Sequence, residues 1–223
     1  PPPPSPSPPP PSPPPPPPSQ PPSPPPRPLL PAPPSQPPSP PCANITLLRE
    51  WQFISFNCIG GMFNTFQVLE TAPWKEDDKI LTRDPYLKFA TFDGDKFVGG
   101  LINHDQLSVS LGYKIYYSGA WGAVLEQTGF PQSPVENVAL RAGWNLIGHA
   151  SLHTIPISEI APVGSPGFSP DDQFKTRAGS SVWITTFSGT SWQGDLTEFT
   201  SGIGYEVKVS QAITFCYVCG TPP

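Results

Sequence analysis

Proline occupies 28 of the first 41 positions, and this density limits the folding of the chain more than any other feature of its sequence. Proline fixes φ at about −65°, removes a backbone N–H donor and pushes the preceding residue towards extended geometry. Residues 1–41 can therefore form neither helix nor sheet, and they carry too few apolar side chains to build a core. We expect a polyproline II rod that rises about 3.1 Å per residue, or about 127 Å in all.

Residues 42–223 have the composition of an ordinary globular protein, with many aromatic and few charged side chains. They are long enough for one domain or two small ones. The net charge of the chain is −5 and the rod contributes only Arg27, so the remainder carries about −6. The sequence has no basic stripe and no run of 18 apolar residues. The first absence argues against nucleic-acid binding, and the second argues against a transmembrane helix.

The chain begins with Pro1–Pro4, ends with Thr221-Pro222-Pro223 and has Met62 as its one methionine. Since Pro1 is not a translation start, we expect either that a signal peptide has been removed or that the chain is an excerpt of a longer protein. If residues 42–223 are called the head, proline-rich sequence at both ends of the chain is what one unit of an array of alternating heads and rods would contain.

Four cysteines, Cys42, Cys58, Cys216 and Cys219, favour two disulfides in a secreted chain. Cys216 and Cys219 lack the strand-to-helix context of a redox CxxC motif. They close a segment that we predict to be a strand, whose extended geometry does not readily join positions i and i+3. We therefore expect both to bond elsewhere, with Cys42 and Cys58 or a neighbouring molecule as candidate partners. Sequence does not choose among the three intramolecular connectivities.

One N-glycosylation signal, Asn44-Ile45-Thr46, lies at the junction between the rod and the following head. Its place beside a predicted disulfide in a chain of secreted character predicts a glycan on Asn44.

Serine–proline motifs recur along the rod: Ser5-Pro6-Ser7-Pro8, Ser12-Pro13-Pro14, Ser23-Pro24-Pro25 and Ser39-Pro40-Pro41. The rod resembles those of the hydroxyproline-rich glycoproteins of green algae and plants, such as the extensins and the pherophorin-like wall proteins. This resemblance covers about a fifth of the chain. It implies proline hydroxylation and O-glycosylation, with the candidate positions Ser5, Ser7, Ser12, Ser23, Ser39, Pro6, Pro13, Pro24 and Pro40. A ligand for SH3-type domains is the structural alternative, but 41 residues far exceed the length that such a ligand needs.

The head contains two copies of one sequence pattern, offset by 92 to 95 residues. The matching segments are 45–54 with 138–147, 74–83 with 168–177, 87–94 with 182–189, and 111–116 with 203–208. Four ordered matches at nearly constant spacing indicate a tandem repeat.

Each copy reads as β structure. Residues 88–92 and 183–187 are rich in aromatic and β-branched residues, and both run into hairpin turn signals. Residues 113–117 and 205–209 alternate large apolar with polar side chains at a period of two. We predict a mostly β fold: a polyproline II rod over 1–41, then two small β-barrel or sandwich modules over 42–133 and 134–223.

The repeat also resembles a module of bacterial secreted and surface proteins with a "GWNLIS" opening, a "WxYDGxxW" hairpin and a "GxGYWVKV" closing strand. The best matches are residues 142–147, 183–192 and 201–209. The first copy departs from the pattern, with Glu50 in place of Gly143. The resemblance implies an accessory β domain and carries no catalytic role.

Comparison of the two copies argues against most of the candidate metal and ligand sites. Asp93-Gly94-Asp95 suggests a calcium loop, but its counterpart Ser188-Gly189-Thr190 has no carboxylate, so a turn explains both. Asp77-Asp78 and Asp171-Asp172 occur in both copies, followed by Arg83 and Arg177. A sugar or calcium site is one interpretation, and a loop or helix cap with the arginine paired to an aspartate is favoured.

His149 and His153 share a strand face if the segment is extended, but no third metal ligand lies nearby. The sequence therefore predicts no metal, no cofactor and no enzymatic activity.

Our first functional hypothesis is a secreted structural glycoprotein that polymerises with copies of itself into a fibril, cell-wall or surface layer. The alternative is a carbohydrate-binding head on a glycosylated stalk, since six tryptophans and six tyrosines exceed what two small cores need. Such aromatic side chains stack on sugars or on a neighbouring proline rod.

Overall fold

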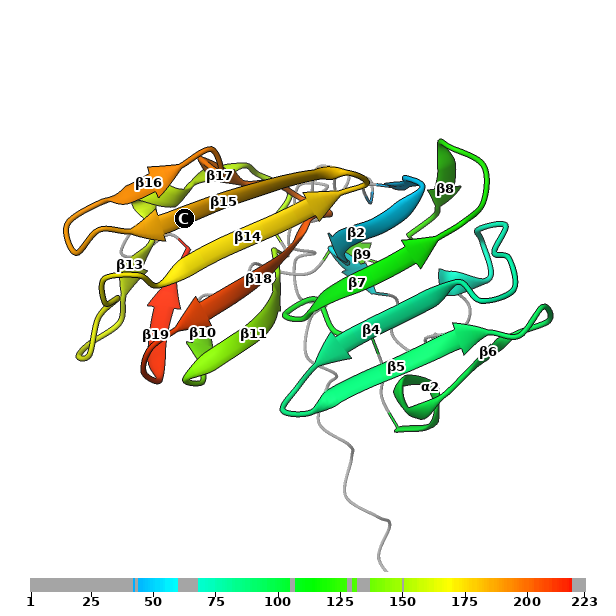
Figure 1. The fold of residues 1–223 in the computed structure, drawn as a ribbon, viewed down its shortest axis with the longest axis horizontal. Coiled ribbons are helices and arrows are strands. Elements are labelled where there is room, and N and C mark those ends of the chain that lie inside the picture. The colour runs from blue at the N-terminus through cyan, green and yellow to red at the C-terminus, as the bar shows by residue number, and fades with distance from the viewer. Residues whose placement is uncertain are drawn as a thin grey trace, which may run out of the picture. The chain divides into compact units, whose positions relative to one another are not determined.

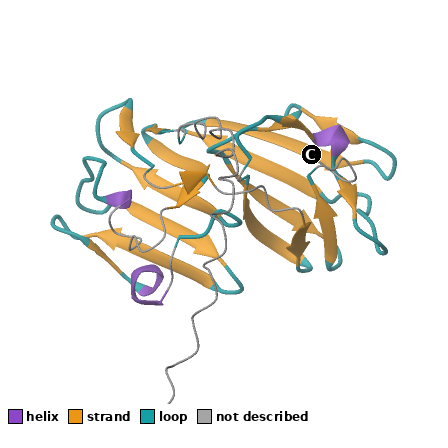
Figure 2. Ribbon diagram, turned by 180° about the vertical axis from the view of Figure 1, so that it is seen from behind, coloured by secondary structure: helices purple, strands orange, loops and turns teal. Residues whose placement is uncertain are grey.

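The computed structural model describes residues 42, 44–59, 68–104, 107–127, 130–131, 137–149 and 151–217. The rod predicted for residues 1–41 lies outside this part of the chain, as do its candidate serine and proline modification sites. All of the described residues belong to one compact unit. Its described residues are mostly β strands, which confirms the predicted class (Figures 1 and 2).

The elements of the first copy follow the repeat pattern in chain order. They are β1 (Ile45–Leu47), β2 (Glu50–Ser55), β3 (Cys58–Ile59), β4 (Lys79–Arg83), β5 (Leu87–Phe92), β6 (Phe97–Val98), α2 (Gly100–His104), β7 (Gly112–Tyr117), β8 (Ala123–Leu125) and β9 (Phe130–Pro131).

The second copy has an equivalent for most of these strands. Its elements are β10 (Asn137–Leu140), β11 (Gly143–Gly148), β12 (Ile155–Pro156), η1 (Ile157–Glu159), β13 (Ala161–Pro162), β14 (Gln173–Ala178), β15 (Ser181–Phe187), β16 (Trp192–Gly194), β17 (Glu198–Phe199), β18 (Gly204–Val209) and β19 (Ile213–Cys216).

The same antiparallel strand pairings recur in both copies. The order β2-β7-β4-β5-β6 in the first copy corresponds to β11-β18-β14-β15-β16 in the second, and β1-β8 corresponds to β10-β19. The registers correspond as well. Ile80 lies opposite Ala90 and Ile115, and the equivalent Phe174 lies opposite Thr185 and Val207. The four sequence matches therefore fall on structurally equivalent strands.

One ten-stranded sheet runs through both copies, because β14 pairs with β2 at Ala178 and Gln52. Figure 1 shows this sheet, and smaller two- and three-stranded sheets lie behind it. No sheet of the described residues closes on itself. The expectation of small barrels is therefore wrong, since the strands at the ends of each half stay open and the two halves extend one another instead.

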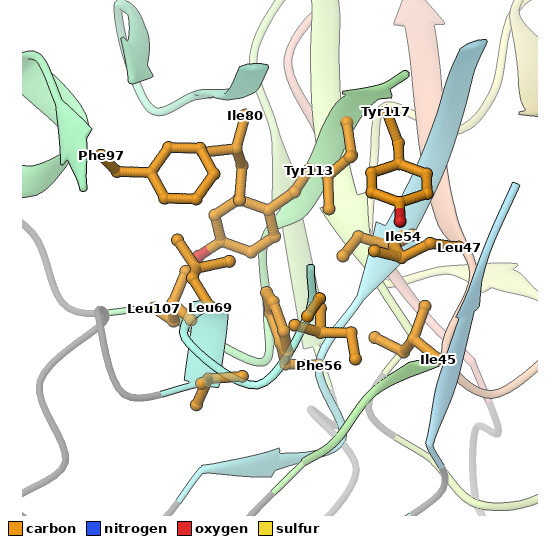
Figure 3. Packing of buried hydrophobic residues seen from close by; sticks show 14 of the residues in the cluster. Ile45, Leu47, Ile54, Phe56, Leu69, Ile80, Phe97, Leu107, Tyr113 and Tyr117 are labelled. Atoms are coloured by element: carbon orange, nitrogen blue, oxygen red, sulfur yellow. The ribbon is translucent and has the colours of Figure 1, made fainter. Parts of the chain in front are cut away.

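A separate hydrophobic core fills each copy. In the first copy, Ile80, Tyr113 and Ile115 of the large sheet pack with Leu47 of β1 and Leu125 of β8 (Figure 3 shows part of this cluster). In β4 the buried Ile80 and Thr82 alternate with more exposed neighbours, which is the period-two pattern of a strand with one buried face. Each fully buried side chain of this size contributes about 1.5–3 kcal/mol.

The second core is built mainly from aromatic rings. Phe174 of β14, Phe199 of β17 and Phe215 of β19 are fully buried. The rings of Phe174 and Phe199 meet edge to face with centroids 5.2 Å apart, an arrangement that adds about 0.5–1.5 kcal/mol to the burial of apolar area. The abundance of aromatic residues in the sequence is thus partly explained by this core.

The two copies touch through contacts that are related by an approximate two-fold axis. The backbone N–H of Ser55 donates to the carbonyl of Gly202 at 3.0 Å, and the N–H of the equivalent Gly148 donates to that of Ser110, also at 3.0 Å. Two isolated bridges repeat the relation: Ile54 with Ile203, and Leu111 with Ile147. We call this axis the pseudo-dyad.

A disulfide joins Cys42 to Cys58, with their Cα atoms 5.7 Å apart. Cys216 is also disulfide-bonded, and Cys219 lies outside the described residues. The expectation that Cys216 and Cys219 bond to Cys42 and Cys58 is therefore wrong. The Cys42–Cys58 bond closes a loop of sequence separation 16 within the first copy, which stabilises the fold by about 3 kcal/mol in the chain-entropy account.

Among the described residues, no helix has the length and apolar character needed to cross a membrane.

Candidate functional site: the outer face of the large sheet

The large sheet has one face on the cores and one face that the described helices and strands leave uncovered. Successive side chains of a strand alternate between faces, and residues opposite each other in register share a face. Ile54, Ile80 and Ile115 point into the first core, so Phe53, Leu81 and Lys114, which neighbour them along their strands, point outward. Figure 1 looks onto this side, and Figure 2 shows that the small sheets and α2 lie on the other. We call the outward-pointing strand positions the outer face.

The outer face gathers cations from both copies of the repeat. Its charged residues are Lys79, Arg83, Lys114, Lys175, Arg177, Glu206 and Lys208. Among the described residues, six of the eleven Lys and Arg thus stand on the outer face, against one of the fifteen Asp and Glu. The sequence alone does not reveal this feature, because these residues are spread over four strands and only the register brings them together.

Large apolar side chains lie exposed among the cations. They are Leu87, Phe89, Val98, Trp144, Val182 and Ile184, with exposed fractions from 37% for Trp144 to 55% for Leu87. The solvated face of an antiparallel sheet is usually polar. A face that combines exposed apolar side chains with one sign of charge is therefore a candidate interaction surface.

A groove of about 480 Å³ lies at the pseudo-dyad on this face. Equivalent residues of the two copies line it: Arg83 with Arg177, Leu87 with Val182, Leu81 with Lys175, and Lys114 with Glu206. The groove is therefore formed jointly by the two copies, and neither copy alone would contain it.

Glu206 holds two lysines in the floor of the groove. Its carboxylate oxygens lie 2.5 Å from Lys114 Nζ and 2.5 Å from Lys175 Nζ. Burial of the Glu206 carboxyl by itself raises its pKa, but the hydrogen bonds and positive charges of Lys114 and Lys175 outweigh burial and hold the pKa below the ordinary value of 4.5. Glu206 is therefore ionised at neutral pH and offsets part of the positive charge of the groove.

Both lysines also cover aromatic rings. Lys114 Nζ lies 4.8 Å from the ring centroid of Phe53, and Lys175 Nζ lies 4.8 Å from that of Trp144. These are cation–π contacts, which contribute about 0.5–2 kcal/mol each. They engage ring faces that would otherwise be open to a sugar or a proline.

In each copy, one aspartate of the repeated acidic pair stabilises a turn by accepting backbone hydrogen bonds. Asp78 is fully buried and accepts hydrogen bonds from the N–H groups of Lys75 at 2.9 Å and Ser118 at 2.7 Å. Asp172 makes the equivalent bonds with Ser169 and Ser210, both at 2.8 Å. The favoured loop role thus accounts for the buried aspartate of each pair, but no ion pair among the described residues joins it to Arg83 or Arg177. Asp77 and Asp171, the other two, are exposed at φ 72° and 69°.

Replacement of Asp78 by asparagine is expected to lower the free energy of unfolding by about 1–3 kcal/mol, because one of the two N–H donors would then face an amide NH₂ in a buried site. The equivalent change Asp172→Asn should cost a similar amount. Asp77→Asn is the matched control, since asparagine tolerates positive φ and this side chain is exposed. Urea titration of the three variants tests the expectation, and equal losses for Asp77→Asn and Asp78→Asn would contradict it.

The calcium-like motif is a turn in both copies. Asp93 Oδ1 accepts from the N–H groups of Asp95 at 3.0 Å and Lys96 at 2.9 Å, and these bonds lower the pKa of Asp93. Ser188 Oγ accepts from the equivalent N–H of Ser191 at 3.1 Å. The hydroxyl thus replaces the carboxylate in the same local role.

His149 is fully buried, and its Nε2 lies 2.8 Å from the carbonyl oxygen of His153, to which it can donate. Burial lowers the pKa of His149, although this hydrogen bond acts in the opposite direction. His153 itself is exposed. No cluster of three or more His, Cys, Asp or Glu suited to a metal occurs within the described residues.

Asn44 is exposed just before β1. Its side chain lines a second groove, of about 440 Å³, together with Trp183. An attached glycan would have open space there.

Comparison with known protein families, curated protein sequences and solved structures found no match for this chain.

Proposed function

We propose that this chain is an extracellular structural glycoprotein that assembles with copies of itself into a fibril, cell-wall or surface layer. Its proline-rich rod would supply length and its tandem β head would supply the contacts. The observation that carries the proposal is a head whose large sheet leaves an apolar, cationic face uncovered, joined to a 41-residue segment that can build no core. Such a face favours a macromolecular partner over a small substrate.

The glycoprotein part of the proposal rests on Asn44 and on the serine–proline motifs of the rod. Asn44 is exposed, as a glycosylated residue must be. The Cys42–Cys58 bond is of the kind that persists in oxidising compartments, which supports secretion. Intact mass measurement of the native chain, before and after removal of glycans, tests this part. An unmodified mass would contradict it.

Electron microscopy of the purified native protein tests assembly. We expect elongated or layered particles whose abundance rises with protein concentration, because each copy would bring one rod and one head. Light scattering on the same sample gives the size distribution. Monodisperse single-chain particles at high concentration would contradict the proposal.

A carbohydrate-binding head on a glycosylated stalk is the second candidate. It is favoured by Tyr86 and Trp121, whose exposed fractions are 78% and 73%. Exposed rings of this kind can stack on sugar faces. Binding to neutral glycans on an array, lost on Trp121→Ala, would favour this candidate, whereas the assembly proposal expects the variant to behave as wild type.

A further inference from the structure

The uncovered outer face carries the opposite charge to the rest of the head. Its strand positions hold six cations and one acid, whereas the other described residues hold five cations and fourteen acids, of which Asp78 and Asp172 are buried. A protein with a net negative charge thus presents one strongly positive surface. The rest of the same chain matches this surface in charge, so a second copy is a suitable partner.

We propose that the outer face docks onto the acidic surface of a second copy of this chain. The inference rests on the proposed self-assembly and adds which surface carries it. Two outer faces cannot meet each other, since that would bring two sets of like charges together, and like-charge contacts cost several kcal/mol. The contact is therefore heterologous, with different surfaces on the two copies. A heterologous contact that does not close into a ring grows into an open filament.

The charge distribution within the face fits such a contact. At its centre, Glu206 offsets part of the charge of Lys114 and Lys175, so less unpaired charge has to lose its water there. Lys79 and Lys208 are exposed and make no ion pair among the described residues, so they are available to acids of a neighbour. A centre whose charge is partly offset, with apolar neighbours and a charged rim, is common in protein interfaces.

The test is the self-association of the full-length native protein, followed by sedimentation velocity at several salt concentrations. We expect association at about 20 mM salt and at least a tenfold weakening at about 500 mM, because screening shortens the range of the attraction. In the double variant Lys79→Glu/Lys208→Glu, association at low salt should weaken by about tenfold or more.

The matched control is Arg49→Glu/Lys75→Glu, which makes the same change in net charge at exposed positions off the outer face. It should associate at least as strongly as wild type. Circular dichroism and thermal unfolding establish that both variants fold. Equal association of the two double variants, no dependence on salt, or growth that stops at a two-copy particle would each overturn the inference.

The outcomes also separate this inference from the proposed function. Filaments that form equally well in both double variants would leave the proposed assembly standing and overturn the role of the outer face. Single-chain particles under all conditions would overturn both. Binding of polygalacturonate or heparin that is lost in the Lys79→Glu/Lys208→Glu variant, while self-association persists, would assign the face to anionic polysaccharides instead.

Discussion

Alanine in place of Gly204 is expected to lower the free energy of unfolding by about 3 kcal/mol or more, a large effect for the addition of a single methyl group. A Cβ at this position would lie 2.2 Å from the carbonyl oxygen of Ile54, an atom of the backbone that no side-chain rotation can move away. The start of β18 would have to separate from the end of β2. That movement breaks the hydrogen bond from Ser55 Oγ to the Ile203 carbonyl, now 2.9 Å long.

The pseudo-dyad predicts a second position with the same behaviour. Gly112 is the equivalent of Gly204, and a Cβ there would lie 2.4 Å from the carbonyl oxygen of Ile147. Gly100→Ala is the control, because a Cβ at Gly100 meets no atom within 4 Å. Thermal unfolding should show a fall of about 6–12 °C for Gly204→Ala and Gly112→Ala. A melting temperature for Gly204→Ala equal to that of the control would contradict the close approach of the two copies.

Replacement of Glu206 by glutamine is expected to cost about 2–4 kcal/mol at neutral pH. Breaking a buried ion pair by removing one partner costs about 3–5 kcal/mol, and the partial exposure of Lys114 and Lys175 reduces this figure. The neutral amide would leave two ammonium groups facing each other at the centre of the groove. Exposed Glu198, changed to glutamine, is the control and should stay within about 0.5 kcal/mol of wild type.

The effect of Glu206 should depend on pH in one direction. Its pKa in the folded chain lies below 4.5, so its contribution to stability is fully present above about pH 4.5 and is lost as the pH falls through the folded-state value. Denaturant titrations from pH 7 down to pH 3 should therefore show a difference between wild type and Glu206→Gln that shrinks with acidification. A difference that stays constant over this range would assign the loss to packing rather than to charge.

Much of the fold follows from the repeat in the sequence. The hairpins around Asp93 and Ser188 and the equivalence of Asp78 and Asp172 could be predicted, because they depend on local turn chemistry and on a period of two. Comparison of the copies also favoured a structural role for these residues, which the hydrogen bonds confirm, whereas the expected pairing of an aspartate with Arg83 or Arg177 is not found among the described residues. Residues 1–41 lie outside the described part of the chain, so the rod remains a prediction.

The parts that escaped prediction depend on contacts between distant segments. The pairing of Cys42 with Cys58 is one of three connectivities that the sequence allows equally. The pairing of β14 with β2, at Ala178 and Gln52, could not be predicted from the alternation of apolar and polar residues in either strand. The cationic outer face depends on this link and on the register of several strands together. The sequence of each strand shows which residues are charged, but it does not show that these residues lie on the same face of one sheet.

The salt bridge across the pseudo-dyad joins the two halves of the head. Lys114 and Glu206 occupy equivalent positions in the two copies and meet near the axis. Two first copies brought together in the same way would place lysine against lysine with no acid between them, whereas two second copies would place two glutamates together, each beside its own Lys175. The mixed pair therefore has a better charge match than a pair of first copies. In the proposed assembly, where many copies would lie close together, this charge match favours pairing of a first copy with a second copy over pairing of two first copies.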